Sequence, residues 1–127
     1  MRRTLIVTLT VLAIALASCT ASLLILDGAV RHADRLRSAA VLASQERRTG
    51  RARELMVELA EFWREKSRLL EILADHDALH EVQAAIAEAQ ICLECDDHDD
   101  FLRTMSTVAE DLNHIRDEQS PRLSNLY

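Results

Sequence analysis

The sequence predicts an all-α protein, in which an N-terminal transmembrane helix continues into a small antiparallel bundle of three to four helices. Composition is the first reason: the 127 residues include two Gly and one Pro, and 49% are apolar, with many Ala, Leu, Glu and Arg. Periodicity is the second, because apolar residues recur at spacings of three and four and do not alternate as they do in strands.

Residues 1–27 are predicted to be a transmembrane signal anchor. Residues 4–26 carry no charge and are bounded by Arg2 and Arg3 on one side and Asp27 on the other. As a helix this run would span about 34 Å, enough to cross a hydrocarbon core of roughly 30 Å. We therefore expect residues 4–26 to contact the lipid bilayer and residues 28–127 to form a separate bundle domain.

Two kinds of processing compete with an uncleaved anchor. Leu16-Ala17-Ser18-Cys19 fits the pattern that precedes a lipidated cysteine, so one alternative is a lipoprotein anchored through Cys19, and a cleaved signal peptide is the other. The apolar run continues past Cys19 to Leu26, where a processed chain normally turns polar, and this favours the anchor. Short positive amino-terminal flanks usually stay in the cytoplasm, so residues 28–127 are expected on the extracytoplasmic side of the cell membrane.

Apolar residues with helical spacing continue beyond the anchor in four sets. The first set, which extends the anchor helix, is Leu26, Val30, Ala33, Leu36, Ala40 and Ala43. The second is Leu55, Leu59, Phe62, Leu69 and Leu73, flanked by Met56, Trp63 and Leu70. The third is Leu79, Val82, Ile86, Ala89 and Leu93, and the fourth is Phe101, Met105, Val108, Leu112 and Ile115. Each face needs a partner and the connections are short, which predicts antiparallel neighbours with Trp63 as a large core anchor.

Turn residues predict where the first two bundle helices end. Gly50 is expected to end the first in a left-handed conformation, after Arg47 and Arg48 in its last turn. The second is expected to start at Arg51 and to end at His76. Its positively charged start leaves open that these two helices are continuous.

Aspartates predict the starts of the last two helices. Asp77 is expected to cap the third, and Asp97 the fourth, with Asp99 and Asp100 in the first turn, where the helix dipole favours anions. Pro121 is expected to stop the fourth helix.

Charge is divided along the chain, with 10 basic and 6 acidic residues in 31–68 but 3 basic and 14 acidic residues in 69–127. In an up-down bundle the loops QERRTGRAR and ECDDHDD share one end, so we expect their arginines and aspartates to pair with one another. A polar surface for a basic partner or cations is the alternative. No nucleic-acid partner is expected, because the basic residues are interleaved with Glu and lack an aromatic stacking platform.

Cys92 and Cys95 form a single C-x-x-C motif. A zinc site would need a second ligand pair, and a redox motif would need a strand before a helix. We interpret Cys92 as a small core residue and Cys95 as a turn residue; a strained disulfide is the alternative.

Several residues of the bundle domain resemble the bacterial domain-of-unknown-function family DUF4363. The similarity lies in Trp63 followed by Lys66, in Asp75-His76 followed by Leu79, and in Leu112-Asn113-His114-Ile115. The resemblance covers about residues 28–120 and implies a single membrane span followed by helices, with no reaction, cofactor or partner. The chain departs from it at His80, where an acidic residue is expected, and in its Cys92-Cys95 pair and acidic loop.

The stretch ILADHDALHEV raises the question of a metal site. Asp75, His76, His80 and His114 are the candidate ligands, because the predicted bundle brings all four to one end and imidazoles with a carboxylate suit zinc. The favoured interpretation is a helix corner, since His80 occupies the position at which a cap at Asp77 would place an acid. We therefore predict no metal and no cofactor.

Neither a nucleophile with its base nor a glycine-rich phosphate loop is visible, so we do not expect an enzyme. The sequence favours an uncharacterised single-pass membrane protein whose bundle is a protein-interaction or structural module, with a homo-oligomer or an envelope protein as partner. The alternative is an envelope metal or ligand sensor that uses the His76 end.

Overall fold

The computed structural model describes the backbone of residues 1–124 and the side chains of residues 1–118. It contains four helices, α1 (Arg2–Gln45), α2 (Thr49–Leu70), α3 (His76–Glu94) and α4 (His98–Ser124), and no strand in the described part of the chain. The predicted all-α bundle is confirmed, and α1 and α2 are separate helices.

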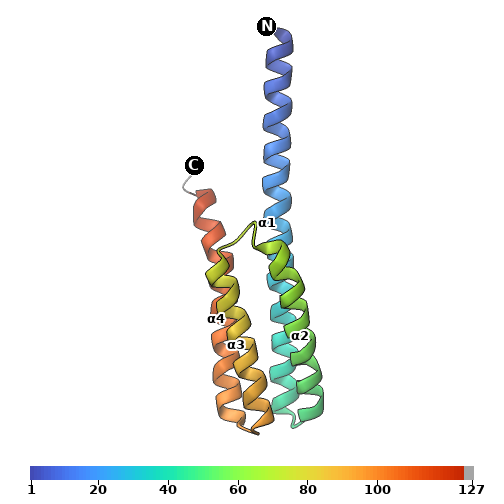
Figure 1. Ribbon diagram of the computed structural model, residues 1–127, viewed down its shortest axis with the longest axis vertical. Helices are drawn as coiled ribbons and strands as arrows, with labels where there is room; N and C mark the ends of the chain where they lie inside the picture. Colours follow the sequence, from blue (N-terminus) through green and yellow to red (C-terminus); the bar gives the residue numbers. More distant parts are fainter. Residues whose placement is uncertain (125–127) are drawn as a thin grey trace.

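Helix α1 is a single helix of 44 residues with two different environments. Its first half stands clear of the rest of the molecule, and its second half is one of the four bundle helices (Figure 1). The first buried residue is Leu26, and all six predicted core positions of this helix are buried. By length and composition, α1 contains one stretch that is long and apolar enough to cross a membrane.

The bundle has up-down-up-down topology, with each helix in contact with two neighbours (Figure 1). The turns at residues 46–48 and 95–97 lie at the end of the bundle farthest from the start of α1, which we call the distal tip. The α2–α3 connection, residues 71–75, lies at the other end, where α1 leaves the bundle; we call this connection the apex.

The core is built from aliphatic side chains around a few large residues. Trp63 and Phe101 are completely buried, as are Met56 and Met105. The indole Nε1 of Trp63 donates to the carbonyl oxygen of Leu79 at 3.1 Å, so the one buried polar atom of this anchor is paired. Every predicted core residue of α3 and α4 is buried.

The predicted face of α2 is partly wrong. Leu69 is 60% exposed, and Phe62 and Leu73 are only half-buried. Ala52 and Ser67 are buried in their place. The prediction favoured large apolar residues, but Ser67 fits a tight helix contact because it is small and its hydroxyl donates to the carbonyl of Trp63 at 2.6 Å.

The turn between α1 and α2 also differs from the prediction. Helix α1 ends at Gln45, and the left-handed residue is Arg47, with φ of 61°, not Gly50. The amides of Arg47 and Arg48 donate to the carbonyls of Ser44 and Ala43, which satisfies the end of α1 without a glycine. Gly50 lies in the first turn of α2, which starts at Thr49.

The remaining boundaries give one confirmation and three corrections. Asp97 caps α4 as predicted, because its Oδ1 accepts from the amide of Asp100 at 3.2 Å. Helix α3 is capped by Asp75 and not by Asp77, because Oδ1 of Asp75 accepts a hydrogen bond from the amide of Asp77. Helix α2 ends at Leu70 and not at His76. Helix α4 continues past Pro121 to Ser124, so the prediction that Pro121 stops this helix is wrong.

The α1–α2 and α3–α4 hairpins are built alike. Their turns place Arg47 and Asp96 in the left-handed conformation, with φ of 61° and 53°. In each turn the next residue donates its amide to the preceding helix, Arg48 to Ala43 and Asp97 to Cys92, at 2.8 and 3.0 Å. The bundle therefore has approximate two-fold symmetry about its long axis, although basic residues in the first turn correspond to acidic residues in the second.

Candidate functional site

A pocket opens at the distal tip, between the ends of the two hairpins. Its volume is about 550 Å³. It is lined by Ser44, Gln45, Arg47, Thr49, Cys92, Leu93, Asp96, Asp97 and His98. All four helices or their turns contribute, so the pocket exists only in the folded bundle.

Ser44 and His98 meet in this pocket. The hydroxyl Oγ of Ser44 lies 2.9 Å from Nδ1 of His98, and Ser44 is buried in the face of α1 that also holds Ala40 and Ala43. Within the described residues no carboxylate makes a hydrogen bond to His98, so the pair lacks the third group that orients a catalytic base. The contact joins α1 to the start of α4 inside the pocket.

Sequence reasoning missed this pair. Ser44 and His98 lie in different hairpins, and neither belongs to a motif that would associate them. The only signal was that Ser44 follows Ala43 on the apolar face of α1, where a polar side chain needs a partner.

The expected pairing between the basic and acidic turns is mostly replaced by local pairs. Across the hairpins, Nη2 of Arg53 lies 3.9 Å from Oδ1 of Asp96 and 3.5 Å from the carbonyl oxygen of Leu93. The other ion pairs of the tip stay within one hairpin: Arg48 with Glu46, Arg51 with Glu54, and Arg103 with Asp100. These pairs are exposed, and such pairs contribute about 0–1 kcal/mol each.

The carboxyl group of Asp100 has a perturbed pKa. A hydrogen bond with Asp97 raises the pKa of Asp100, and the charge of Arg103 opposes this effect. The tip thus carries crowded negative charge at the start of α4, where the amide groups of the first turn stabilise it.

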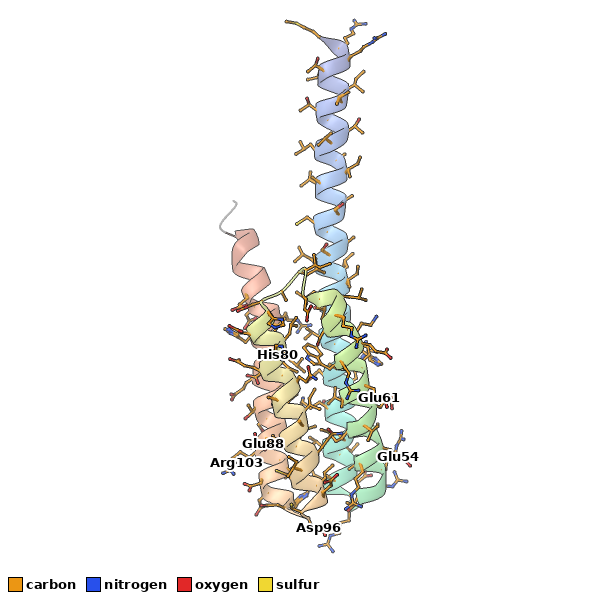
Figure 2. The ribbon with its side chains drawn as sticks, in the orientation of Figure 1. Glu54, Glu61, His80, Glu88, Asp96 and Arg103 are labelled. Atoms are coloured by element: carbon orange, nitrogen blue, oxygen red, sulfur yellow. The ribbon has the colours of Figure 1, made fainter. Side chains whose placement is uncertain are left out.

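The predicted metal candidates do not converge. His76 and His80 do meet, with ring centroids 4.3 Å apart at an angle of 82°, and Figure 2 shows His80 near the apex end of α3. His114 instead lies 3.1 Å from Glu118, and Asp75 is occupied as the cap of α3. Within the described residues, no group of three or more His, Cys, Asp or Glu side chains is arranged to hold a metal ion.

The two cysteines of the C-x-x-C motif are free thiols. Cys92 packs against the core, with its Sγ 3.9 Å from Oγ1 of Thr104, and Cys95 is exposed in the turn after α3. These are the places that the sequence predicted for a core residue and a turn residue.

The comparison with protein families gives one match, to the model described as a domain of unknown function, DUF4363, over residues 23–126. The chain belongs to this family. The match begins at Leu23, three residues before the first buried residue of α1, Leu26, so the family's shared domain is the four-helix bundle. Neither the curated proteins nor the solved structures give a match.

Proposed function

We propose that this DUF4363 protein is a single-pass membrane protein that presents its bundle on the extracytoplasmic side as an interaction or structural module. One observation carries the proposal: α1 is uninterrupted from its exposed apolar half into the bundle core. A helix without a hinge fixes the position of the bundle relative to the membrane that its first half would cross.

The exposed half of α1 supports a membrane span. Its large apolar side chains are all more than half exposed: Leu5, Ile6, Val7, Leu9, Val11, Leu12, Ile14 and Leu16. A continuous apolar surface of this size is not stable in water. Its threonine hydroxyls donate to carbonyls one turn back, as polar side chains do in lipid.

The distal tip supports association, because it is the part of the bundle farthest from the anchor and carries the pocket. We propose an envelope protein or a second copy of the chain as its partner. No reaction is proposed, because within the described residues no carboxylate orients His98 for acyl transfer.

The native Cys95 tests the anchor and its orientation, because it is exposed at the distal tip. In a full-length chain with Cys19→Ala and Cys92→Ala, a membrane-impermeant maleimide should label Cys95 in intact cells. The control is Arg2→Cys, on the flank before the apolar run, in a chain without Cys19, Cys92 and Cys95; it should react only after permeabilisation. The proposal is contradicted if Cys95 is not labelled in intact cells, or if the chain is found in the soluble fraction and not in the membrane fraction.

Mass spectrometry of the wild-type chain separates the anchor from the lipoprotein. An uncleaved anchor retains residues 1–18, whereas processing would give a mature chain that starts with a lipidated Cys19. Affinity capture then tests association: the detergent-solubilised full chain should retain a partner that the anchor alone, residues 1–27, does not. Recovery of the same proteins with both would contradict an interaction role for the bundle.

A further inference from the structure

The apex carries large apolar side chains that the bundle does not bury. Ile72 in the apex is 87% exposed, and Leu69, the last residue but one of α2, is 60% exposed. We propose that this surface, Leu69 with Ile72, rests in the interfacial layer of the bilayer that α1 crosses, and gives the bundle a second membrane contact. The inference depends on the proposed membrane anchor.

The register of α1 and α2 places this surface at the level of the apolar run. The rings of His32 on α1 and Phe62 on α2 lie 4.4 Å apart, so these residues are level with each other. The helices are antiparallel and rise about 1.5 Å per residue, so moving up α2 from Phe62 to Leu70 corresponds to moving up α1 from His32 to Leu24. Leu69 and Ile72 therefore flank the level of Leu24, within the run that would cross the membrane.

The shape of the apex agrees with this register. In Figure 1 the connection after α2 rises beside α1 and then descends to the start of α3. The charged residues at the start of α3 thus lie below the highest point. Glu71, the first residue of the apex, has Oε1 3.6 Å from Nδ1 of His76 on α3.

A layer of ion pairs marks the aqueous side of this surface. Asp27 lies 3.0 Å from Arg31 and 3.0 Å from Arg116 of α4. Asp117 and Glu118 follow Arg116 and are exposed, so carboxylates of α4 reach about the level of Ile25, which is also the level of Leu69. This level suits the headgroup layer and not the hydrocarbon centre, and it makes the contact at the apex shallow.

The bilayer accounts for the exposure better than a protein partner does. The apolar side chains of the apex are continuous in height with Leu24 and Ile25, which are themselves 68% and 54% exposed. If α1 crosses a bilayer, lipid is already present beside this surface. Two attached points would restrict the tilt of the bundle, and the distal tip would then face away from the membrane in a fixed direction.

Quenching by brominated lipid tests the contact in the full chain reconstituted in phosphatidylcholine vesicles. Trp63 is buried in the bundle, so the parent chain gives the background emission. Ile72→Trp adds an indole at the apex, and the matched control Ile91→Trp adds one at an exposed apolar site near the distal tip. Leu12→Trp, in the middle of the apolar run, reports the anchor itself.

We expect the added emission of Ile72→Trp and of Leu12→Trp to be lost in brominated vesicles, and that of Ile91→Trp to be unchanged. Bromines near the headgroup should quench Ile72→Trp more than bromines near the chain ends, and Leu12→Trp should show the reverse. Quenching of Leu12→Trp without quenching of Ile72→Trp overturns the inference and leaves the anchor intact. If the emission of Ile72→Trp is blue-shifted but not quenched, protein covers the apex, and this result also overturns the inference. If neither Ile72→Trp nor Leu12→Trp is quenched, the proposed membrane anchor itself is wrong.

Discussion

Trp63 and Leu69 are both large apolar residues of α2, yet only Trp63 is buried. The sequence predicts both on the buried face of α2, because apolar spacing does not show which face the neighbouring helices cover. Trp63 could be predicted as an anchor since it lies within a turn of Leu59 and Phe62. The exposure of Leu69 could not, because it depends on the level at which α1 leaves the bundle and on burial of the small residue Ser67.

Replacing Trp63 with alanine should destabilise the bundle by about 3–5 kcal/mol, because it removes a fully buried indole and leaves a cavity. That loss is a large part of the stability of an ordinary domain of this size. The change is measured as the free energy of chemical unfolding of the full chain in detergent micelles. Val57→Ala is the matched control on the same helix: Val57 is exposed, and its truncation should change stability by less than about 0.5 kcal/mol. Equal effects of the two substitutions would show that Trp63 is not a core residue.

At the scale of the helix, apolar faces were easier to predict than helix ends. The core positions of α3 and α4 follow regular spacing, and all are buried. The ends depend on a choice between adjacent residues of similar chemistry. Asp75 and Asp77 are both competent caps, and the structure uses Asp75; Gly50 is the obvious left-handed residue, and the structure uses Arg47. Such choices are decided by where the paired helix must turn, which no local pattern records.

Gly50→Ala distinguishes the two accounts of the α1–α2 turn. In the structure Gly50 is helical, and a Cβ added there meets nothing within 4 Å. The substitution should therefore stabilise the protein by up to about 1 kcal/mol, the difference in helix propensity between Ala and Gly in a helix interior. A left-handed Gly50, as the sequence predicted, would make the same change destabilising. Gly28→Ala is the positive control in the unfolding measurement, because Gly28 is helical and equally open.

At the scale of the whole molecule, the candidate site was only partly predictable. The sequence correctly placed the basic and acidic turns at one end, but it did not associate Ser44 with His98 or find the pocket between the hairpins. It also placed Asp75, His76, His80 and His114 together from an approximate helix count. Contacts between α3 and α4 depend on side-chain direction, and His114 pairs with Glu118 on its own helix.

The arrangement of these histidines predicts a zinc-independent fold. Only His76 and His80 meet, and two imidazoles are fewer ligands than a protein zinc site uses. The melting temperature of the full chain should be the same with zinc and with a chelator. Zinc binding at a hundredfold excess over its dissociation constant would instead stabilise the chain by about 2.7 kcal/mol. A zinc-dependent rise in the parent that is absent in His80→Ala would make the His76 end a sensor site.

Asp111 on α4, in the acidic α3–α4 hairpin, has a raised pKa. Partial burial is the main cause that raises the pKa of Asp111, and the charges of Glu81 on α3 and Glu110 add to it, while His114 acts in the opposite direction. A carboxyl group with a raised pKa in the folded state favours folding when it is protonated. Its ionisation therefore destabilises the fold as pH rises above 3.8, the ordinary value for aspartate.

Asp111→Asn should consequently raise the melting temperature at neutral pH, because the amide has no charge to repel Glu81 and Glu110. The gain should shrink as pH falls and vanish below pH 3.8, where the parent carboxyl group is protonated in both the folded and the unfolded chain. Glu88→Gln is the control, since it removes one negative charge from an exposed position of α3, which is labelled in Figure 2. If both variants gain equally, the effect comes from net charge alone; if Asp111→Asn gains more, and only above pH 3.8, the crowded carboxylates between α3 and α4 are its cause.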